Sequence, residues 1–382
     1  MFERELRELE KKHLLRTIIS RDSSQGAVIT IKNKKYLNFS SNDYLGLANN
    51  PDIVQAVHSS LQRYAFGPGA SRMLAGGGPL HEKLERRISS FKGTEAALIF
   101  NSGYAANTGI IPSIATEADV LFSDELNHAS IIDGCRLSSA RTLIYRHRDM
   151  AHLHSLLKKA KARRKIVITD SVFSMDGDLA PLPDIHEICR RHSAFLYIDD
   201  AHGTGVLGRG RGALAHFGFK SEPWIIQMGT FSKALGAFGA FVTGSEDVIK
   251  WISNTARSFL FSTALPSCMI AAADAGLRLV KRGPSIVGKL WSNRERLFEG
   301  LKSIGYYDNV SATPILTLRT AKISEALRLS KYLYEKGVYV PAIRPPTVRG
   351  PRLRITVTAA HTEKQIDALI TTLRKADVRL LN

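Results

Sequence analysis

The middle of the chain alternates short apolar runs with polar or glycine-rich clusters and helical stretches. The apolar runs are Ala96–Phe100, Val120–Phe122, Ile166–Thr169, Phe195–Ile198 and Trp224–Met228. Short apolar strands that alternate with helices are typical of an α/β protein with a mostly parallel sheet and helices on both faces. Because ligands bind beyond the carboxyl ends of such strands, we expect the polar clusters that follow these runs to meet in one crevice.

The pattern changes after about residue 271, which predicts a smaller C-terminal α/β domain. A helical stretch there extends through Leu301. Further strands are expected near Pro314–Leu318, Val338–Val340 and Leu353–Val357, and a closing helix over about Glu363–Lys375. The C-terminal part therefore has the elements of a small domain of its own.

The N-terminal part predicts a helix followed by a hairpin. Leu6, Leu9 and Leu14 are spaced as in an amphipathic helix, and Gly26–Tyr44 has the pattern of a hairpin. We therefore divide the chain into an N-terminal helix and hairpin segment (1–45), a large domain (46–275) and a small domain (276–382).

Composition limits the cellular context. No apolar run in the 382 residues approaches the ~20 residues of a membrane span, and the N-terminal segment lacks the apolar stretch of a signal peptide. Cys135, Cys189 and Cys268 lie far apart without a CxxC pair, so neither a metal site nor a disulfide framework is indicated. We expect a cytoplasmic protein with no membrane association.

The net charge of +18 is unusual, and such a field attracts polyanions. The densest basic run is Lys158–Lys165. We interpret it as the solvated end of a helix that leads into the strand at Ile166, in preference to a binding patch. The sequence has no zinc-finger spacing, no basic region with heptads and no aromatic RNP-like strand. Nucleic-acid binding is therefore the weaker hypothesis.

Lys233 is the first candidate for catalysis. It lies in Gly229–Gly236, which offers hydroxyls at Thr230 and Ser232 beside glycines that allow close approach of a ligand. A Schiff-base lysine needs a phosphate-holding loop nearby and surroundings that lower its proton affinity. A lysine after a strand is more often a surface residue, but the neighbouring polar clusters favour covalent binding of pyridoxal 5'-phosphate (PLP).

Asp199 ends an apolar run, where an unpaired carboxylate would be costly to bury. A protonated pyridine nitrogen would compensate that charge and make the cofactor ring an electron sink. Asp200 better fits a capping or ion-paired role. His202 could reach the phenolic oxygen of the cofactor, and the flat imidazole of His128 could stack on its ring.

Gly103 and Tyr104 fit the phosphate end of the cofactor, because a glycine amide at a strand-to-helix turn is a natural anion ligand. The hydroxyl of Ser174 is a further candidate contact. Each of these residues alone is more often ordinary loop polarity. Together with the lysine, the carboxylate and the stacking ring, they supply every group that PLP requires.

The chain resembles the α-oxoamine synthase family in three motifs, Asn38–Gly46, Ser171–Asp178 and Asp199–Gly205. The resemblance extends over nearly the whole chain. The resemblance implies a fold-type I PLP-dependent transferase that forms a homodimer. Within the family, Asp199–Gly205 and Ile343–Val348 are most similar to the members that act in biotin biosynthesis. Those members imply condensation of L-alanine with a pimeloyl thioester, carried by an acyl carrier protein or by coenzyme A, with release of carbon dioxide.

The resemblance also implies roles for individual residues. Lys233, His128 and Asp199 would be the catalytic residues, with Lys233 forming the Schiff base. The remaining cofactor contacts would be Gly103, Tyr104, Ser174, His202, Thr230 and, towards the phosphate of the neighbouring subunit, Thr263. Besides His128, the substrate contacts would be Arg16, Asn42, Thr347 and Arg354, of which Arg354 would hold the carboxylate of the amino acid.

Two alternatives stay open. A sister enzyme with the same machinery, such as glycine C-acetyltransferase or 5-aminolevulinate synthase, would take glycine, and Ile343–Val348 argues against it. A basic nucleic-acid-binding protein on an enzyme-like fold would be colourless and would bind duplexes in a salt-sensitive way.

Overall fold

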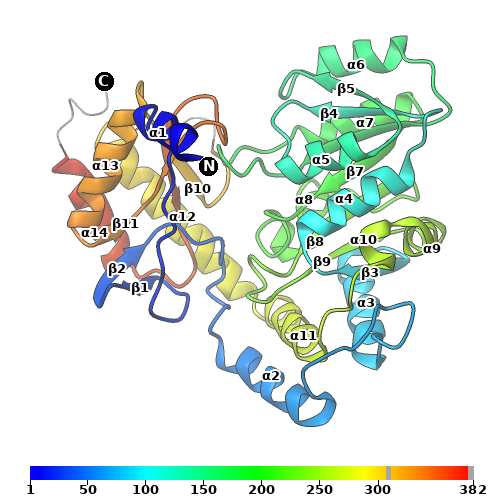
Figure 1. Cartoon of the computed structure of the whole chain (residues 1–382), viewed down its shortest axis with the longest axis horizontal. Helices are drawn as coiled ribbons and strands as arrows, with labels where there is room; N and C mark the ends of the chain where they lie inside the picture. Colours follow the sequence, from blue (N-terminus) through cyan, green and yellow to red (C-terminus); the bar gives the residue numbers. More distant parts are fainter. Residues whose placement is uncertain (307–310, 377–382) are drawn as a thin grey trace. The chain divides into compact units, whose positions relative to one another are not determined.

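The computed structural model describes residues 1–306 and 311–376, and the chain divides into two compact units (Figure 1). Unit 1 comprises Met1–Asn49, Ser174–Asp178 and Gly288–Asn382, and unit 2 comprises Asn50–Phe173 and Leu179–Val287. This division differs from the three segments that the sequence predicts. Strand β2 (Lys34–Asn38) pairs with β11 (Val338–Tyr339), which joins the N-terminal segment to the C-terminal part.

A seven-stranded sheet forms the centre of unit 2, in the order β3-β9-β8-β7-β6-β4-β5. The strands are β3 (Ala96–Phe100), β4 (Val120–Asp124), β5 (Arg141–Tyr145), β6 (Lys165–Asp170), β7 (Phe195–Asp199), β8 (Ile225–Thr230) and β9 (Ala240–Gly244). All neighbours pair in parallel except β9, which is antiparallel to β3 and β8. The mostly parallel sheet and its five apolar strands are therefore confirmed, and β5 and β9 are added.

Helices cover both faces of this sheet. Side chains alternate between the faces along each strand, so Ile166 and Ile168 point to one side and Thr169 to the other. The first face packs against α4 (Gly103–Ile114), α5 (Ala129–Leu137), α9 (Glu246–Thr255) and α10 (Arg257–Leu260) in one apolar cluster. On the second face lie α6 (Met150–Lys159) and α7 (Leu182–Arg191), which pack against β4, β5 and β7.

The remaining helices of unit 2 are α2 (Pro51–Tyr64), α3 (Pro79–Lys92), the 3-10 turn η1 (Gly208–Gly210), α8 (Ala213–His216) and α11 (Ser267–Arg282). Helix α11 packs against α2 and α3. All three cysteines are buried free thiols. Among the helices of residues 1–306 and 311–376, none combines the length and apolarity that crossing a bilayer would require.

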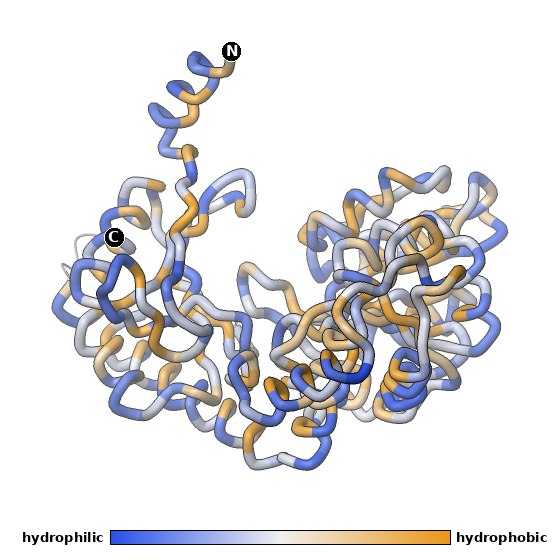
Figure 2. The backbone as a smooth tube through the Cα atoms, turned by 60° about the horizontal axis from the view of Figure 1, so that its bottom comes forward, coloured by the Kyte–Doolittle hydropathy of each residue, from blue (hydrophilic) through white to orange (hydrophobic). Residues whose placement is uncertain are grey.

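Unit 1 contains two three-stranded sheets, ordered β1-β2-β11 and β10-β13-β12. The further strands are β1 (Val28–Ile31), β10 (Ile315–Arg319), β12 (Ala342–Ile343) and β13 (Arg352–Thr356). The helices are α1 (Glu3–Lys11), α13 (Ile323–Glu335), α14 (Glu363–Arg374) and residues 288–303 of α12 (Pro284–Ser303). The N-terminal helix and hairpin are confirmed. Helix α1 mixes hydrophilic and hydrophobic positions (Figure 2), and none of its residues is buried.

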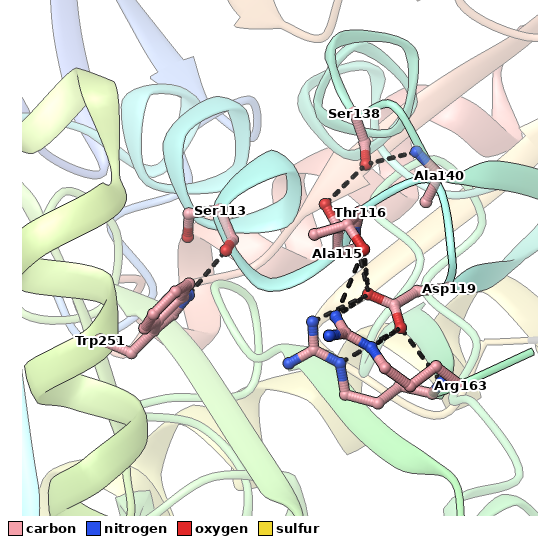
Figure 3. A network of polar contacts seen from close by, with 9 residues as sticks. Ser113, Ala115, Thr116, Asp119, Ser138, Ala140, Arg163 and Trp251 are labelled. Carbon is pink, nitrogen blue, oxygen red and sulfur yellow. Dashed lines mark hydrogen bonds and ion pairs between the residues drawn. The ribbon is translucent and has the colours of Figure 1, made fainter.

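The second half of the basic run Lys158–Lys165, which leads into β6, has a structural role. Lys158 and Lys159 lie exposed in the last turn of α6. Arg163 and Arg164 instead bind the buried carboxylate of Asp119, at 3.1 and 2.8 Å (Figure 3). Burial alone would raise the pKa of Asp119, but the hydrogen bonds from the two arginines hold it below its usual range. These contacts support the interpretation of the run as a helix end and not as a binding patch.

A buried ion pair fixes the turn that follows β7. Lys92 Nζ lies 2.7 Å from Asp200 Oδ2, and both side chains are at most 1 % exposed. Lys92 also donates to the carbonyl oxygen of Arg211, while Asp200 accepts from the hydroxyls of Ser171 and Thr204. Asp200 is thus an ion-paired residue, as the sequence indicated. It holds the turn in place immediately after Asp199.

We expect Lys92→Met to lower the free energy of unfolding by about 3–5 kcal/mol, because the substitution leaves the Asp200 carboxylate buried without its counter-charge. Chemical denaturation measures this change. The same substitution at the exposed Lys158 is the control, and its effect should stay within about 0.5 kcal/mol. A loss below about 1 kcal/mol at Lys92 would show that the pair is not required for stability.

Candidate active site

Four titratable residues gather at the carboxyl ends of the central strands of unit 2. Asp170 ends β6 and Asp199 ends β7, directly opposite each other in the register. His128 precedes α5, and its backbone N–H donates to Asp170 Oδ2 at 2.7 Å. Lys233 follows β8, and its positive charge acts on each of the other three. The structure thus brings Lys233, His128 and Asp199 together in one cluster.

The two carboxyl groups of this cluster are both buried, and the pKa of each is raised. Burial raises the pKa of Asp199, whereas the charge of Lys233 and the hydrogen bonds from Asn107 and the Ala201 N–H act in the opposite direction. Burial also raises the pKa of Asp170, and the negative charge of Asp199 raises it further, to well above its usual value. Asp199 thus has a nearby cation and two hydrogen-bond donors that favour its ionised form against the effect of burial.

The imidazole of His128 is held in its neutral form. Desolvation lowers its pKa and Lys233 lowers it further, while the charge of Asp199 opposes both. Nδ1 accepts the backbone N–H of Ser130 at 3.3 Å and lies 2.7 Å from the Ser130 hydroxyl. Because Nδ1 accepts, the proton of the neutral ring resides on Nε2. The residue is exposed, so a flat ligand has access to it.

A buried amide connects the anion with this histidine. Asn107, on α4, donates from Nδ2 to Asp199 Oδ2 and to Ser130 Oγ, both at 2.8 Å. The hydroxyl of Tyr197 donates to Asn107 Oδ1 at 2.7 Å. Burial raises the pKa of Tyr197 well above its usual value, so the hydroxyl keeps its proton. The amide orientation is thereby determined, because the opposite orientation would place its oxygen against the carboxylate of Asp199.

Sequence analysis missed Asn107, Ser130 and Tyr197. A signal was present for two of them. Asn107 is a lone amide on the otherwise apolar buried face of α4, and an amide in that position needs partners. Tyr197 lies two residues before Asp199 on the same strand, so both side chains point to the same face of the sheet. The role of Ser130 depends on the packing of α5 beside α4 and has no such signal.

The start of α4 offers backbone donors to an anion. Ser102 caps the helix by accepting the N–H of Ala105 at 3.1 Å. The amides of Gly103 and Tyr104, in the first turn, have no partner within the helix. A Cβ on Gly103 would meet only Met228 Cε, at 3.8 Å, so the space beside the glycine is open. This is the arrangement that favours phosphate at a helix N-terminus.

Hydroxyl groups lie at the end of β8. Thr230 is buried and donates to the carbonyl oxygen of Gly239 at 2.9 Å. Its oxygen lies 2.7 Å from the hydroxyl of Ser232 and accepts the Ser232 N–H at 3.2 Å. The hydrogen of Thr230 is engaged within the turn, whereas Ser232 is exposed. Ser232, next to Lys233, is therefore the more accessible of the two hydroxyls.

Three more predicted cofactor residues belong to unit 2. His202 is buried in the turn that Asp200 holds. The exposed ring of Tyr104 donates its hydroxyl to Asp133, and that bond raises the pKa of the phenol. Thr263 is exposed, and its carbonyl oxygen accepts from Asn101 at 2.9 Å. The contact of Thr263 with a neighbouring subunit stays a prediction.

Arg354 lies at the centre of a separate group in unit 1. Its guanidinium donates to Thr356 Oγ1 at 2.9 Å, to Asn42 Oδ1 at 3.1 Å and to the carbonyl oxygen of Ser174. Burial raises the pKa of Tyr44 to about 12, and Arg354 acts against that rise. Arg354 is 7 % exposed, so these contacts hold its planar fork in one orientation. Three predicted residues, Asn42, Ser174 and Arg354, are brought together here.

Arg16 and Thr347 form another contact in unit 1. Arg16 Nη2 donates to Thr347 Oγ1 at 3.2 Å and to the carbonyl oxygens of Arg344 and Pro345 at 3.3 and 3.2 Å. Arg344 in turn donates to the carbonyl oxygen of Leu15 at 2.6 Å. The two predicted substrate residues, 331 positions apart in the chain, therefore touch.

The groups of unit 2 fit PLP by their chemistry. Asp199 is a buried carboxyl group that suits a pyridinium, Lys233 is a half-buried amine that suits the aldehyde, and His128 is an accessible flat ring. The first-turn amides of α4 suit the phosphate. A buried carboxyl group that faces a lysine is the feature of this set that an ordinary structural site least requires.

The sequence matches the family model for aminotransferase class I and II over residues 34–373. A putative 8-amino-7-oxononanoate synthase of Thermodesulfovibrio yellowstonii is 48 % identical over 97 % of this chain and 95 % of the relative. The 8-amino-7-oxononanoate synthase of Thermoanaerobacter pseudethanolicus is 43 % identical over 98 % of this chain and 96 % of the relative. Both likenesses extend over nearly the whole length of each protein.

Solved structures share the fold. A variant of serine palmitoyltransferase from S. paucimobilis, with a bound PLP–myriocin aldimine, superposes with a TM-score of 0.93 and is 28 % identical, over 99 % of this chain and 98 % of the other. The 8-amino-7-oxononanoate synthase of Francisella tularensis has a TM-score of 0.77 and 27 % identity, over 89 % and 97 %. The fold-type I architecture is thereby confirmed.

Proposed function

We propose a reaction from the premise that this chain belongs to the aminotransferase class I and II family, as a relative of its 8-amino-7-oxononanoate synthases. It is a PLP-dependent acyltransferase. Its reaction is the decarboxylative condensation of L-alanine with a pimeloyl thioester to 8-amino-7-oxononanoate, a step of biotin biosynthesis. The observation that supports this proposal most is the cluster of Lys233, Asp199 and His128 in unit 2.

PLP supplies an electron-withdrawing ring that takes up negative charge from the α-carbon of the amino acid. Asp199 would keep a proton on the pyridine nitrogen, because the charge of Lys233 and two hydrogen bonds favour its ionised form. Lys233 would hold the cofactor covalently, and its amine would remove the Cα proton of alanine. His128 presents its neutral ring for stacking and for contact with the substrate.

Arg354 would hold the carboxylate of alanine. Its guanidinium is fixed by Asn42, Thr356 and the carbonyl oxygen of Ser174, so little side-chain freedom is lost when a carboxylate binds. A carboxylate held in a set orientation also sets the direction of the Cα–H bond, which is required for its cleavage. Arg16 and Thr347 would contact the acyl substrate, and His202 and Thr230 the cofactor.

The partners are also proposals. The thioester would be carried by an acyl carrier protein or coenzyme A, and the working unit would be a homodimer in which Thr263 contacts the cofactor phosphate of the partner. Three buried free thiols are consistent with a reducing compartment such as the cytoplasm.

Mass spectrometry of the product tests the proposed function. The PLP-loaded enzyme is incubated with alanine or glycine and with pimeloyl, acetyl or succinyl thioesters. We expect 8-amino-7-oxononanoate from alanine and the pimeloyl thioester, with the other pairs at least about tenfold slower. Faster turnover of glycine with the acetyl thioester would overturn the proposal in favour of glycine C-acetyltransferase activity.

Asn107 offers a test of how Asp199 is positioned. We expect Asn107→Ala to lower kcat about ten- to a hundredfold, because the buried carboxylate loses a charge-assisted hydrogen bond. Tyr197→Phe removes only the hydroxyl that orients the amide, and its effect should be about threefold to tenfold. Both variants should also shift the pH dependence of the absorption of the bound cofactor. An unchanged kcat and pH profile with lower stability alone would show that the amide is only structural.

A further inference from the structure

Helices α3 and α11 enclose a groove of about 610 Å3 on unit 2. Its basic lining residues are Lys83, Arg86, Arg87, Arg278, Lys281 and Arg282, and its other lining residues are Ser90, Phe91 and Leu277. All of these belong to the two helices, which pack against each other. The groove is thus a continuous concave surface with cations from both walls and two aromatic or aliphatic side chains.

Among the residues that the structure describes, half of these cations have no ion-pair partner. Asp274 binds both Arg87 and Arg278, and Glu82 lies 3.7 Å from Arg86. Within the described residues, no ion pair involves the exposed Lys83, Lys281 or Arg282. Exposed like charges that face one concave space repel each other unless an anion enters it. The groove therefore favours an acidic ligand.

The spacing of the cations points to a helical partner. Lys83, Arg86 and Arg87 lie at positions i, i+3 and i+4 of α3, and Arg278, Lys281 and Arg282 repeat that spacing on α11. Acidic residues on one face of a helix recur at the same spacing. The row from Lys83 to Ser90 extends for about 10 Å, which is nearly two helical turns. Such a row can pair with the acidic face of a helix laid along it.

We propose that this groove docks an acidic acyl carrier protein that brings the thioester substrate. The inference rests on the proposed function, because that reaction consumes a thioester and releases its carrier in every turnover. If that carrier is an acidic protein, the enzyme must bind this polyanion once in every turnover. The net charge of +18 would steer the encounter, and the groove would select the orientation of the carrier.

The test compares the pimeloyl thioester of a carrier protein with that of coenzyme A, using the full-length PLP-loaded enzyme. In Lys83→Glu/Lys281→Glu, we expect kcat/KM for the carrier thioester to fall about tenfold or more at low ionic strength, and that for the coenzyme A thioester to change less than about twofold. Lys158→Glu/Lys159→Glu is the control, with the same change of net charge on exposed lysines of α6, and should lower carrier turnover less than about threefold.

Each other outcome overturns the docking proposal. If kcat/KM fell equally for both thioesters, the substitutions would act on the reaction itself and not on docking. If the α6 control lowered kcat/KM for the carrier thioester as much as the groove variant, the effect would come from net charge alone. If the wild-type enzyme used only the coenzyme A thioester, the docking proposal would be wrong while the proposed function stood. If neither thioester were used, the proposed function would fail.

Binding of the unacylated carrier protein, measured by fluorescence anisotropy, separates docking from turnover. We expect the affinity to fall at least about tenfold in the groove variant and to depend on salt. A labelled DNA duplex is measured in parallel. If the groove substitutions weakened binding of the duplex and left binding of the carrier unchanged, the groove would be a nucleic-acid site and the proposal would be rejected.

Discussion

Lys233→Ala is expected to lower the rate of condensation by about a thousandfold or more, because in the proposed mechanism one amine both holds the cofactor and moves the Cα proton. The expected protein is colourless after dialysis and still folded, since Lys233 is half-buried and its removal leaves no large cavity. Turnover of alanine and pimeloyl thioester, measured with added PLP, gives the rate.

Lys233→Arg separates the two possible reasons for that loss. Arginine keeps the positive charge that faces Asp199, but its very high pKa prevents it from acting as a base or reacting with an aldehyde. We expect the same loss as with alanine. Lys220→Ala, at an exposed lysine of the same unit, is the control and should keep full activity. If Lys233→Arg retained more than about a tenth of the activity, Lys233 would act through its charge alone.

The local elements of unit 2 could be predicted from the sequence, because most residues of each central strand form a short apolar run. Strands β5 and β9 were missed. β5 is an edge strand that begins with Arg141 and Thr142 and has partly exposed residues, whereas β9 is antiparallel and returns beside β3 after a glycine-rich turn. The polar residues at the strand ends were found because parallel strands bring such ends to the same edge.

The sequence does not predict how tertiary packing orients the polar groups of the site. The rise in the pKa of Asp170 depends in part on its register opposite Asp199, which no local pattern reveals. The connection from Asn107 to Ser130 requires α4 and α5 to lie side by side. The pairing of β2 with β11 joins segments about 300 residues apart, and it explains why contacts group the N-terminal segment with the C-terminal part.

Asp199→Asn is the second substitution with a large expected effect. In the proposed mechanism it removes the charge that would keep the pyridine nitrogen protonated. It also places the amide NH2 group against one of two existing donors, Asn107 Nδ2 or the Ala201 N–H. We expect kcat to fall about 10²- to 10³-fold, as when one preorganised electrostatic contact is lost. Steady-state kinetics and the absorption spectrum of the bound cofactor measure the effect.

The loss should not come from unfolding. Burial raises the pKa of Asp199, so its ionised form costs folding free energy above the pKa of the unfolded chain, and a neutral replacement relieves that cost. Asp133→Asn, which removes a charge that also acts on His128, is the control and should change kcat less than about threefold. A wild-type kcat in Asp199→Asn would exclude Asp199 as the partner of the cofactor.

Peptide mapping of the PLP-loaded protein after borohydride reduction tests the covalent link to Lys233 most directly. Reduction makes the bond between the amine and the cofactor permanent, so the modified residue can be read from the fragment masses. We expect a single pyridoxyl phosphate group, carried by the peptide that contains Lys233. A modified peptide from any other lysine, or an unmodified Lys233 in a protein saturated with PLP, would contradict the assignment.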